Sequence, residues 1–222
     1  MGAMIPLGDV SRPLRRWPIV TVLLILANVY VFTRELVYGD AFLYYFSAIP
    51  VYIVAGSRWW TILTAMFLHG GWLHIIGNMI YLWAFGPEIE DAMGRWRFLF
   101  FYLLGGTVAM LAQVAASPFS RIPSLGASGA IAAVMGAFIV TYPRDRIKTA
   151  LWFVLFVRIA FVPAALLIGF WFLMQLFSAG QVSHHVQMGG VAYVAHIGGF
   201  LFGVLTARLW ISNPRRASSR NW

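Results

Sequence analysis

Six apolar runs, separated by short polar or basic segments, dominate the pattern of this 222-residue chain. A helix needs about 20 mostly apolar residues to cross the hydrocarbon core of a bilayer, so runs of this kind are typical of membrane spans. The pattern therefore predicts an all-α, polytopic membrane protein with six transmembrane helices. The predicted spans cover residues 17–33, 72–85, 98–116, 127–142, 162–177 and 190–210.

Two segments between the spans do not follow this pattern. Residues 34–71 are rich in Tyr and Trp but are broken by glycines and by Pro50. We expect a structured loop in the membrane interface, where these aromatic rings are favoured. Residues 149–161 carry Arg158, whose charge is costly in the middle of a membrane. We expect this second segment to lie at the interface or to re-enter the membrane.

The spans divide the chain into three parts. Residues 1–16 form a basic cytoplasmic N-terminal segment, residues 17–211 the six-helix membrane domain, and residues 212–222 a basic cytoplasmic tail. The first apolar run could instead belong to a signal peptide. No small-x-small cleavage pattern follows it before Arg34, so we interpret it as a span.

Composition narrows the class of protein. Hydrophobic residues make up 61% of the chain and charged residues 10%, whereas soluble domains have about 45–50% and about 25%. These values exclude a soluble enzyme, a disordered chain and a DNA-binding domain. The chain has no cysteine, which excludes disulfides, thiolate nucleophiles and cysteine-based metal sites.

The net charge of +9 indicates membrane orientation rather than a nucleic-acid partner. If the six spans leave both termini inside, 13 of the 16 basic residues fall on the inner side and only Arg34, Arg58 and Arg121 fall outside. This asymmetry agrees with the positive-inside rule. The inner residues are Arg12, Arg15, Arg16, Arg95, Arg97, Arg144, Arg146, Lys148, Arg158, Arg208, Arg215, Arg216 and Arg220.

Four polar side chains lie at a similar predicted depth within three spans. His74 and Asn78 fall in the first two turns of the second span, Ser128 begins the fourth, and His196 lies about six residues, or ~9 Å, into the sixth. All three spans start on the outer side. Because polar groups inside a membrane are costly, their coincidence in depth indicates a functional site.

Ser128 has the setting of a nucleophile. It lies in Gly126-Ala127-Ser128-Gly129, at the start of a predicted helix. Free N–H groups at a helix N-terminus suit a developing oxyanion, and the glycines allow a tight turn. A serine hydroxyl needs an adjacent base, and His196 is the histidine of a later span at matching depth.

Small residues indicate that the fourth and sixth spans can approach closely. Ser128, Ala132 and Gly136 share one helix face, and Gly199 and Gly203 recur on the His196 face. Small residues on both faces let two membrane helices come together. The alternative is that these faces serve only packing, with His196 as an ordinary buried histidine.

His74 and Asn78 are neighbours on one helix face and can both donate hydrogen bonds toward one point, as an oxyanion hole requires. They could instead join helices, or His69, His74 and His196 could bind zinc, although no acid lies at this depth. Of the outer acids, Glu35 and Asp40 both precede the second span, so we expect a dyad rather than a triad. The polar residues Gln113, Gln175, His184 and His185 receive no role.

The order and spacing of these motifs resemble the rhomboid family of intramembrane serine proteases, of the bacterial type with a six-helix core. The resemblance covers nearly the whole chain. It rests on HGGWLHIIGN at 69–78, GPEIEDAMG at 86–94, GASG at 126–129 and AHIGGF at 195–200, and the opening MIPLGD at 4–9 is also similar.

This resemblance implies roles for individual residues. Ser128 would be the nucleophile and His196 the general base, with His74, Asn78 and the Ser128 N–H as the oxyanion hole. Glu90 would tie the second span to its neighbours near the inner face. Many members carry an aromatic residue four positions after the nucleophile, packed on the histidine, but here that position is Ala132. Another side chain must then hold the ring. The supporting residues would be His69, Gly126, Gly129 and Gly199.

We therefore expect a serine endopeptidase without cofactor or metal, whose partners are transmembrane protein substrates and the lipid bilayer. We expect it in a bacterial inner membrane with the site open to the outer side. A mitochondrial location is less expected because residues 1–16 are short and interrupted by Pro for a transit peptide. The alternatives are a catalytically inactive rhomboid-like binder and a small transporter.

Overall fold

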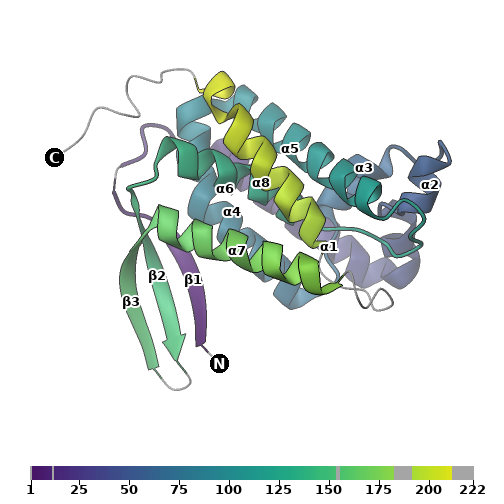
Figure 1. The fold of residues 1–222 in the computed structure, drawn as a ribbon, viewed down its shortest axis with the longest axis horizontal. Coiled ribbons are helices and arrows are strands. Elements are labelled where there is room, and N and C mark those ends of the chain that lie inside the picture. Colours follow the sequence, from purple (N-terminus) through teal and green to yellow (C-terminus); the bar gives the residue numbers. More distant parts are fainter. Residues whose placement is uncertain (1, 12, 154–155, 183–191, 212–222) are drawn as a thin grey trace.

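The computed structural model describes residues 2–11, 13–153, 156–182 and 192–211, and most of these are helical (Figure 1). Within these ranges, three helices are long and apolar enough to cross a membrane, namely α1 (Ile19–Phe46), α5 (Arg95–Ala116) and α8 (Tyr193–Trp210). The other main helices are α4 (Trp72–Met93), α6 (Ser128–Thr141) and α7 (Ala164–Val182). The helical class is confirmed, and the count of six spans stays a prediction.

Two helices continue beyond their predicted ends. The predicted first span ends at residue 33, but α1 runs to Phe46 across a kink at Gly39, where φ is 66°. The predicted second span ends at Gly86-Pro87, but α4 continues through Pro87 to Met93. Ile89 and Met93 are fully buried in the core, so packing holds the last turns together despite the hydrogen bond that proline cannot donate.

The rest of segment 34–71 folds into short helices, which agrees with the expected structured loop. These are α2 (Pro50–Val54), α3 (Thr61–Thr64) and the 3₁₀ helix η1 (Ala65–Phe67). The guanidinium of Arg58 lies 5.5–5.7 Å from the ring centroids of Tyr44, Tyr45 and Tyr52. Cation–π attraction to three rings therefore ties the end of α1 to the segment that follows it.

A small sheet departs from the all-α prediction. Strands β1 (Gly2–Asp9), β2 (Arg146–Phe153) and β3 (Phe156–Pro163) pair antiparallel in the order β1-β2-β3. Gly2 pairs with Phe153 and Asp9 with Ile147. Residues 149–161, expected to lie at the interface or to re-enter the membrane, belong to a β-hairpin of β2 and β3. Their position relative to the membrane stays a prediction. A hairpin by itself is only marginally stable in water. Here β1, which lies more than 130 residues before β2 in the chain, adds a third strand to it.

The apolar core surrounds α6. Every α6 residue from Gly129 to Phe138 is buried, as expected for a helix that is apolar on all sides. It packs against α4, α5 and α8, and the largest buried side chains around it include Phe85, Phe98 and Tyr102. Ser128 therefore begins the central helix of the molecule.

Glycines let the backbones of α6 and α8 touch, as their small residues predicted. A Cβ on Gly199 would lie 2.1 Å from the Gly129 carbonyl oxygen, and one on Gly203 would lie 2.0 Å from that of Ala133. A Cβ on Gly136 would lie 2.3 Å from the Phe200 carbonyl oxygen. The contact on α6 thus includes Gly136 of the predicted face, whereas Gly129 and Ala133 take the places of Ser128 and Ala132.

Glu90 joins α4 to the start of α1. Its carboxylate accepts hydrogen bonds from the Val20 N–H at 3.0 Å, from the Thr21 N–H at 2.7 Å and from the Thr21 hydroxyl at 2.8 Å. Glu90 is buried. An acceptor with negative charge at a helix N-terminus satisfies N–H groups that have no partner within the helix.

Replacing Glu90 with Ala should lower the thermal unfolding midpoint in detergent. A hydrogen bond to a charged group contributes about 1.5–3 kcal/mol, so losing three should destabilise the fold by about 3 kcal/mol or more. The control is Asp91→Ala on the same helix, whose carboxylate accepts one long bond of 3.4 Å from the Arg15 N–H. Equal midpoints for the two variants would contradict a structural role for Glu90.

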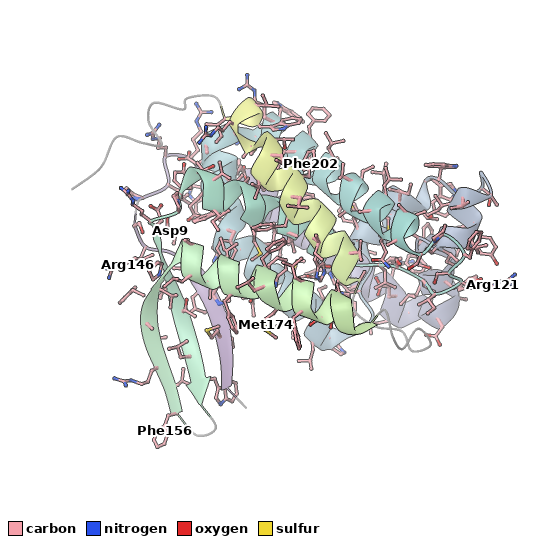
Figure 2. The ribbon with its side chains drawn as sticks, viewed as in Figure 1. Asp9, Arg121, Arg146, Phe156, Met174 and Phe202 are labelled. Atoms are coloured by element: carbon pink, nitrogen blue, oxygen red, sulfur yellow. The ribbon has the colours of Figure 1, made fainter. Side chains whose placement is uncertain are left out.

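Asp9 and Asp145 meet where the sheet joins the helices, and Asp9 lies beside Arg146 in Figure 2. Asp9 Oδ1 accepts the Ser11 N–H at 2.8 Å, and Ser11 Oγ accepts the Arg146 N–H at 2.7 Å. Burial and, to a smaller extent, the Asp145 carboxyl beside it raise the pKa of Asp9 to about 6, against the opposing hydrogen bonds from Ser11. A proton on Asp9 lets the two carboxyl groups form a hydrogen bond.

Stability should therefore fall as the pH rises from about 4 to about 6. The folded protein binds the Asp9 proton more tightly than the unfolded chain, so stability from this group is present at low pH and is lost through the folded pKa. Asp9→Asn should raise the unfolding midpoint at pH 7.5 more than at pH 5, because its amide can donate to Asp145 at either pH. Asp40→Asn, at an exposed position, is the control. A variant effect of equal size at both pH values would contradict this linkage.

Candidate active site

The turn before α6 brings Ser128 next to His74. Gly126 has φ of 123°, a conformation that favours glycine, and its N–H donates to the Ala65 carbonyl at 2.8 Å. A Cβ on Gly126 would lie 2.9 Å from His74 Nε2 and 3.5 Å from Ser128 Oγ. A side chain at this position would therefore collide with the predicted site, which explains the glycine.

Ser128 and His196 form a hydrogen-bonded pair. His196 lies in the first turn of α8, is buried, and places Nε2 2.7 Å from Ser128 Oγ. This distance suits proton transfer between a hydroxyl and an imidazole. The close backbone contact between α6 and α8 makes the pair possible, because it brings the N-terminal ends of both helices together.

The other ring nitrogen of His196 contacts α7. Nδ1 lies 2.7 Å from Gln175 Oε1, and Gln175 Nε2 donates to the Trp171 carbonyl at 3.3 Å. The Trp171 ring lies 5.8 Å from the His196 ring, measured between centroids, and the Tyr193 ring lies 6.4 Å away. Trp171 thus packs on the histidine ring, a contact that the short side chain of Ala132 cannot make.

Sequence reasoning missed the contacts of Gln175 and Trp171. Gln175 is the one amide within the predicted fifth span, and Trp171 precedes it by four residues, which puts both on one helix face. This spacing was a usable signal. It did not say which helix the face would contact.

His74 and Asn78 present donors on α4. The Gly70 N–H donates to His74 Nδ1 at 3.3 Å, which leaves Nε2 to carry the proton on the side of Gly126 and Ser128. Asn78 is buried, and its Nδ2 has no hydrogen-bond partner among the residues that the structure describes. Both side chains can therefore donate to a ligand.

His69 lies behind His74. Its ring is buried, packs edge-on against the His74 ring at 5.0 Å, and neither nitrogen makes a hydrogen bond of normal geometry with the described residues. Its backbone N–H donates to the two carboxylate oxygens of Glu35 at 3.0 and 3.2 Å. Glu35 was expected near the outer end of the first span; it is buried within α1 and holds the turn before α4.

Several polar residues stand apart from the Ser128–His196 pair. Gln113 lies on α5 with Oε1 unpartnered, whereas His184 and His185 lie outside the described residues. Within the described ranges, no group of three or more His, Cys, Asp or Glu side chains is placed to hold a metal ion.

A small pocket opens beside Ser128. Its wall consists largely of glycine, alanine and other apolar side chains from the turn before α6, from α5 and from α8. The residues that line it include Met110, Leu125, Gly126, Gly129 and Ala195.

Known proteins resemble this chain over the same region. A sequence model of the Rhomboid domain matches residues 56–213. Rhomboid protease GluP of Bacillus subtilis is 37% identical over 94 residues, which make up 42% of this chain and 18% of that protein. Presenilin-associated rhomboid-like protein A, mitochondrial, of Danio rerio is 33% identical over 162 residues, or 72% of this chain and 39% of that protein.

A mitochondrial protein from yeast is also similar to this chain. Rhomboid protein 1, mitochondrial, of Saccharomyces cerevisiae is 30% identical over 149 residues, which are 65% of this chain and 40% of that protein. The chain thus spans less than half of the length of each of these relatives. The domain match covers more than two thirds of the chain and includes Ser128 and His196. Its extent, together with the apolar helices, shows that the chain belongs to the rhomboid family as an integral, multi-pass membrane protein.

Proposed function

We propose that this protein is an intramembrane serine endopeptidase that cleaves transmembrane segments of other membrane proteins near the outer membrane face. The observation that carries the proposal is the 2.7 Å contact between Ser128 Oγ and His196 Nε2. Relatives named as proteases support a hydrolase. The serine type and the roles of individual residues belong to the proposal.

The dyad would act in two steps. His196 Nε2 takes the hydroxyl proton as Ser128 Oγ attacks the carbonyl carbon of the scissile bond, and then gives that proton to the leaving amine. The acyl-enzyme that results is hydrolysed when His196 accepts a proton from an attacking water and returns it to Ser128 Oγ as the bond between Oγ and the carbonyl carbon breaks. The dyad therefore needs access to water, which a cavity open to the outer side would supply.

Three donors would stabilise the negative oxygen of the tetrahedral intermediate. His74 Nε2 faces the turn beside Ser128, the Asn78 amide has an unused donor, and the Ser128 N–H begins a helix. Donors aimed where charge develops lower the barrier because they need no reorganisation during the reaction. His69 would support His74 by packing.

The substrate would have to unwind near the cleaved bond. A helical peptide bond is hydrogen-bonded and shielded, so Oγ cannot reach its carbonyl carbon. The pocket beside Ser128, lined by Gly126, Gly129 and Ala195, suits a small side chain. We expect small or helix-breaking residues near the cleaved bond to favour cleavage.

The distribution of charge supports the proposed orientation. Arg121, predicted outside, lies at the opposite end of the molecule from Arg146, predicted inside (Figure 2). With both termini cytoplasmic, the Ser128–His196 pair lies nearer the outer side. We place the protein in a bacterial inner membrane; its relatives come from bacteria and from mitochondria.

The deciding experiment incubates purified protein in detergent with a generic transmembrane substrate and compares it with Ser128→Ala. Mass spectrometry of the products identifies the cleaved bond. Cleavage by the wild type alone supports the proposal. Equal cleavage by both proteins would mean that a contaminating protease is responsible and would reject it.

The two alternatives predict other outcomes. An inactive rhomboid-like binder would retain the substrate uncut through purification, and a transporter would give solute flux in liposomes. Inactive relatives lack the serine or the histidine, whereas this chain pairs both, which favours the enzyme.

A further inference from the structure

We propose that Gln175 is a positioning residue that fixes the tautomer and orientation of His196. This inference rests on the proposed serine protease function. It adds a third member to the expected dyad, an amide carried by α7 in place of the carboxylate of a triad. Figure 1 shows α7 and α8 side by side, and the two helices are in contact.

The chain of hydrogen bonds has a single direction. Gln175 Nε2 donates to the Trp171 carbonyl at 3.3 Å, so Oε1 is the atom that faces His196. An amide oxygen only accepts, and therefore the His196 Nδ1, 2.7 Å away, carries the proton. The other nitrogen, Nε2, is then left with a lone pair toward Ser128 Oγ.

This tautomer is the one that a general base needs. A histidine with its proton on Nε2 cannot accept the serine proton, so the wrong tautomer stops the reaction even when the ring is in place. A catalytic histidine is usually held by a carboxylate. Among the described residues, Gln175 supplies the one side-chain oxygen within hydrogen-bond distance of His196 Nδ1.

Burial strengthens the effect of this contact. Gln175 is 9% exposed and His196 is 7% exposed, so water competes poorly for Nδ1. Trp171 packs on the ring from the same helix, and Phe172 stacks on Phe200 of α8 at 4.2 Å between centroids. Helix α7 thus supplies both the acceptor and the wall that hold the ring.

The first test replaces Gln175 with Met, which has a similar volume and no strong acceptor. We expect kcat for a transmembrane substrate to fall by about 10–100-fold with KM within about twofold, because the base is disturbed while substrate contacts remain. Gln113→Met on α5 is the matched control and should keep wild-type kcat.

The second test replaces Gln175 with Glu. A carboxylate would still accept the Nδ1 proton, so kcat should recover relative to Gln175→Met. The added negative charge favours the imidazolium, and the acid limb of kcat/KM should move to higher pH by about one unit. Recovery of kcat with a carboxylate but not with methionine shows that the acceptor matters, because a side chain that only fills space would not distinguish Glu from Met in this way.

A third measurement is independent of activity. In ¹⁵N spectra of histidine-labelled protein, the wild-type His196 should show the proton on Nδ1, and Gln175→Met should shift the signal toward a mixture of tautomers. His196→Ala assigns the signal.

The outcomes separate this inference from the proposed function. Wild-type kcat in Gln175→Met, or an unchanged tautomer, would overturn the role of Gln175 and leave the protease proposal standing. If Gln175→Met does not fold, the tautomer of His196 in the wild type and the kcat of Gln175→Glu decide the question. If the wild type itself cleaves nothing, the failure lies with the proposed function.

Discussion

Alanine at either Ser128 or His196 is expected to abolish cleavage of a transmembrane substrate. The two side chains share one hydrogen bond of 2.7 Å and act as a unit, so removing one removes most of what both contribute. We expect kcat to fall by at least about 10⁴-fold in each variant. The double variant should be no slower than the singles, because effects of such a unit are not additive.

A fluorophosphonate probe provides the second measurement. It should label Ser128 in the wild type, and labelling should be lost in Ser128→Ala and in His196→Ala. The unfolding midpoints in detergent should stay near that of the wild type, which shows that the loss is chemical. Ser124→Ala, in the loop before α6, is the matched serine control and should be labelled normally. Residual cleavage in both single variants would contradict the dyad.

Loss of one oxyanion donor should lower kcat less than loss of Ser128 or His196, but more than a substitution on the protein surface. His74→Ala and Asn78→Ala should each lower kcat by about 10²–10³-fold, the usual effect of removing one such donor. The His74 ring faces Gly126 and Ser128, and the Asn78 amide has an unused buried donor. These donors act on the intermediate, so KM should change little.

A conservative variant separates donation from packing. Asn78→Asp keeps the size of the side chain but removes the amide donor, and it should be at least as slow as Asn78→Ala. His69→Ala is a comparison on the same turn, where the ring packs on His74 without a hydrogen bond of its own. If Asn78→Asp cleaved at the wild-type rate, Asn78 would have no role as a donor.

The ends of the helices could be predicted from the sequence to different degrees. The start of α6 at Ser128 was predicted within one residue, because a glycine turn and an apolar run mark it. The end of α4 was not, since Pro87 is a helix breaker in isolation but lies here among buried side chains. Local signals locate a boundary only where tertiary packing does not override them.

The sheet shows a second limit. The apolar, β-branched residues of 146–163 fit a strand as well as an interfacial segment, and Pro6 and Gly8 hide β1, which has an irregular register between them. Pairing between Asp9 and Ile147 depends on residues far apart in the chain. No local pattern encodes such a contact.

By itself, the sequence determined that the chain is apolar enough for a membrane, and it placed Ser128, His196, His74 and Asn78 at one depth. Hydropathy and helical rise act along the axis of each span, so they settle depth without knowledge of the neighbours. Only the tertiary structure decided that α7 lies against α8, with Gln175 on His196 Nδ1 and Trp171 on its ring. Lipid is as apolar as a neighbouring helix, so hydropathy carries no information on which helices meet; close packing and hydrogen bonds decide it.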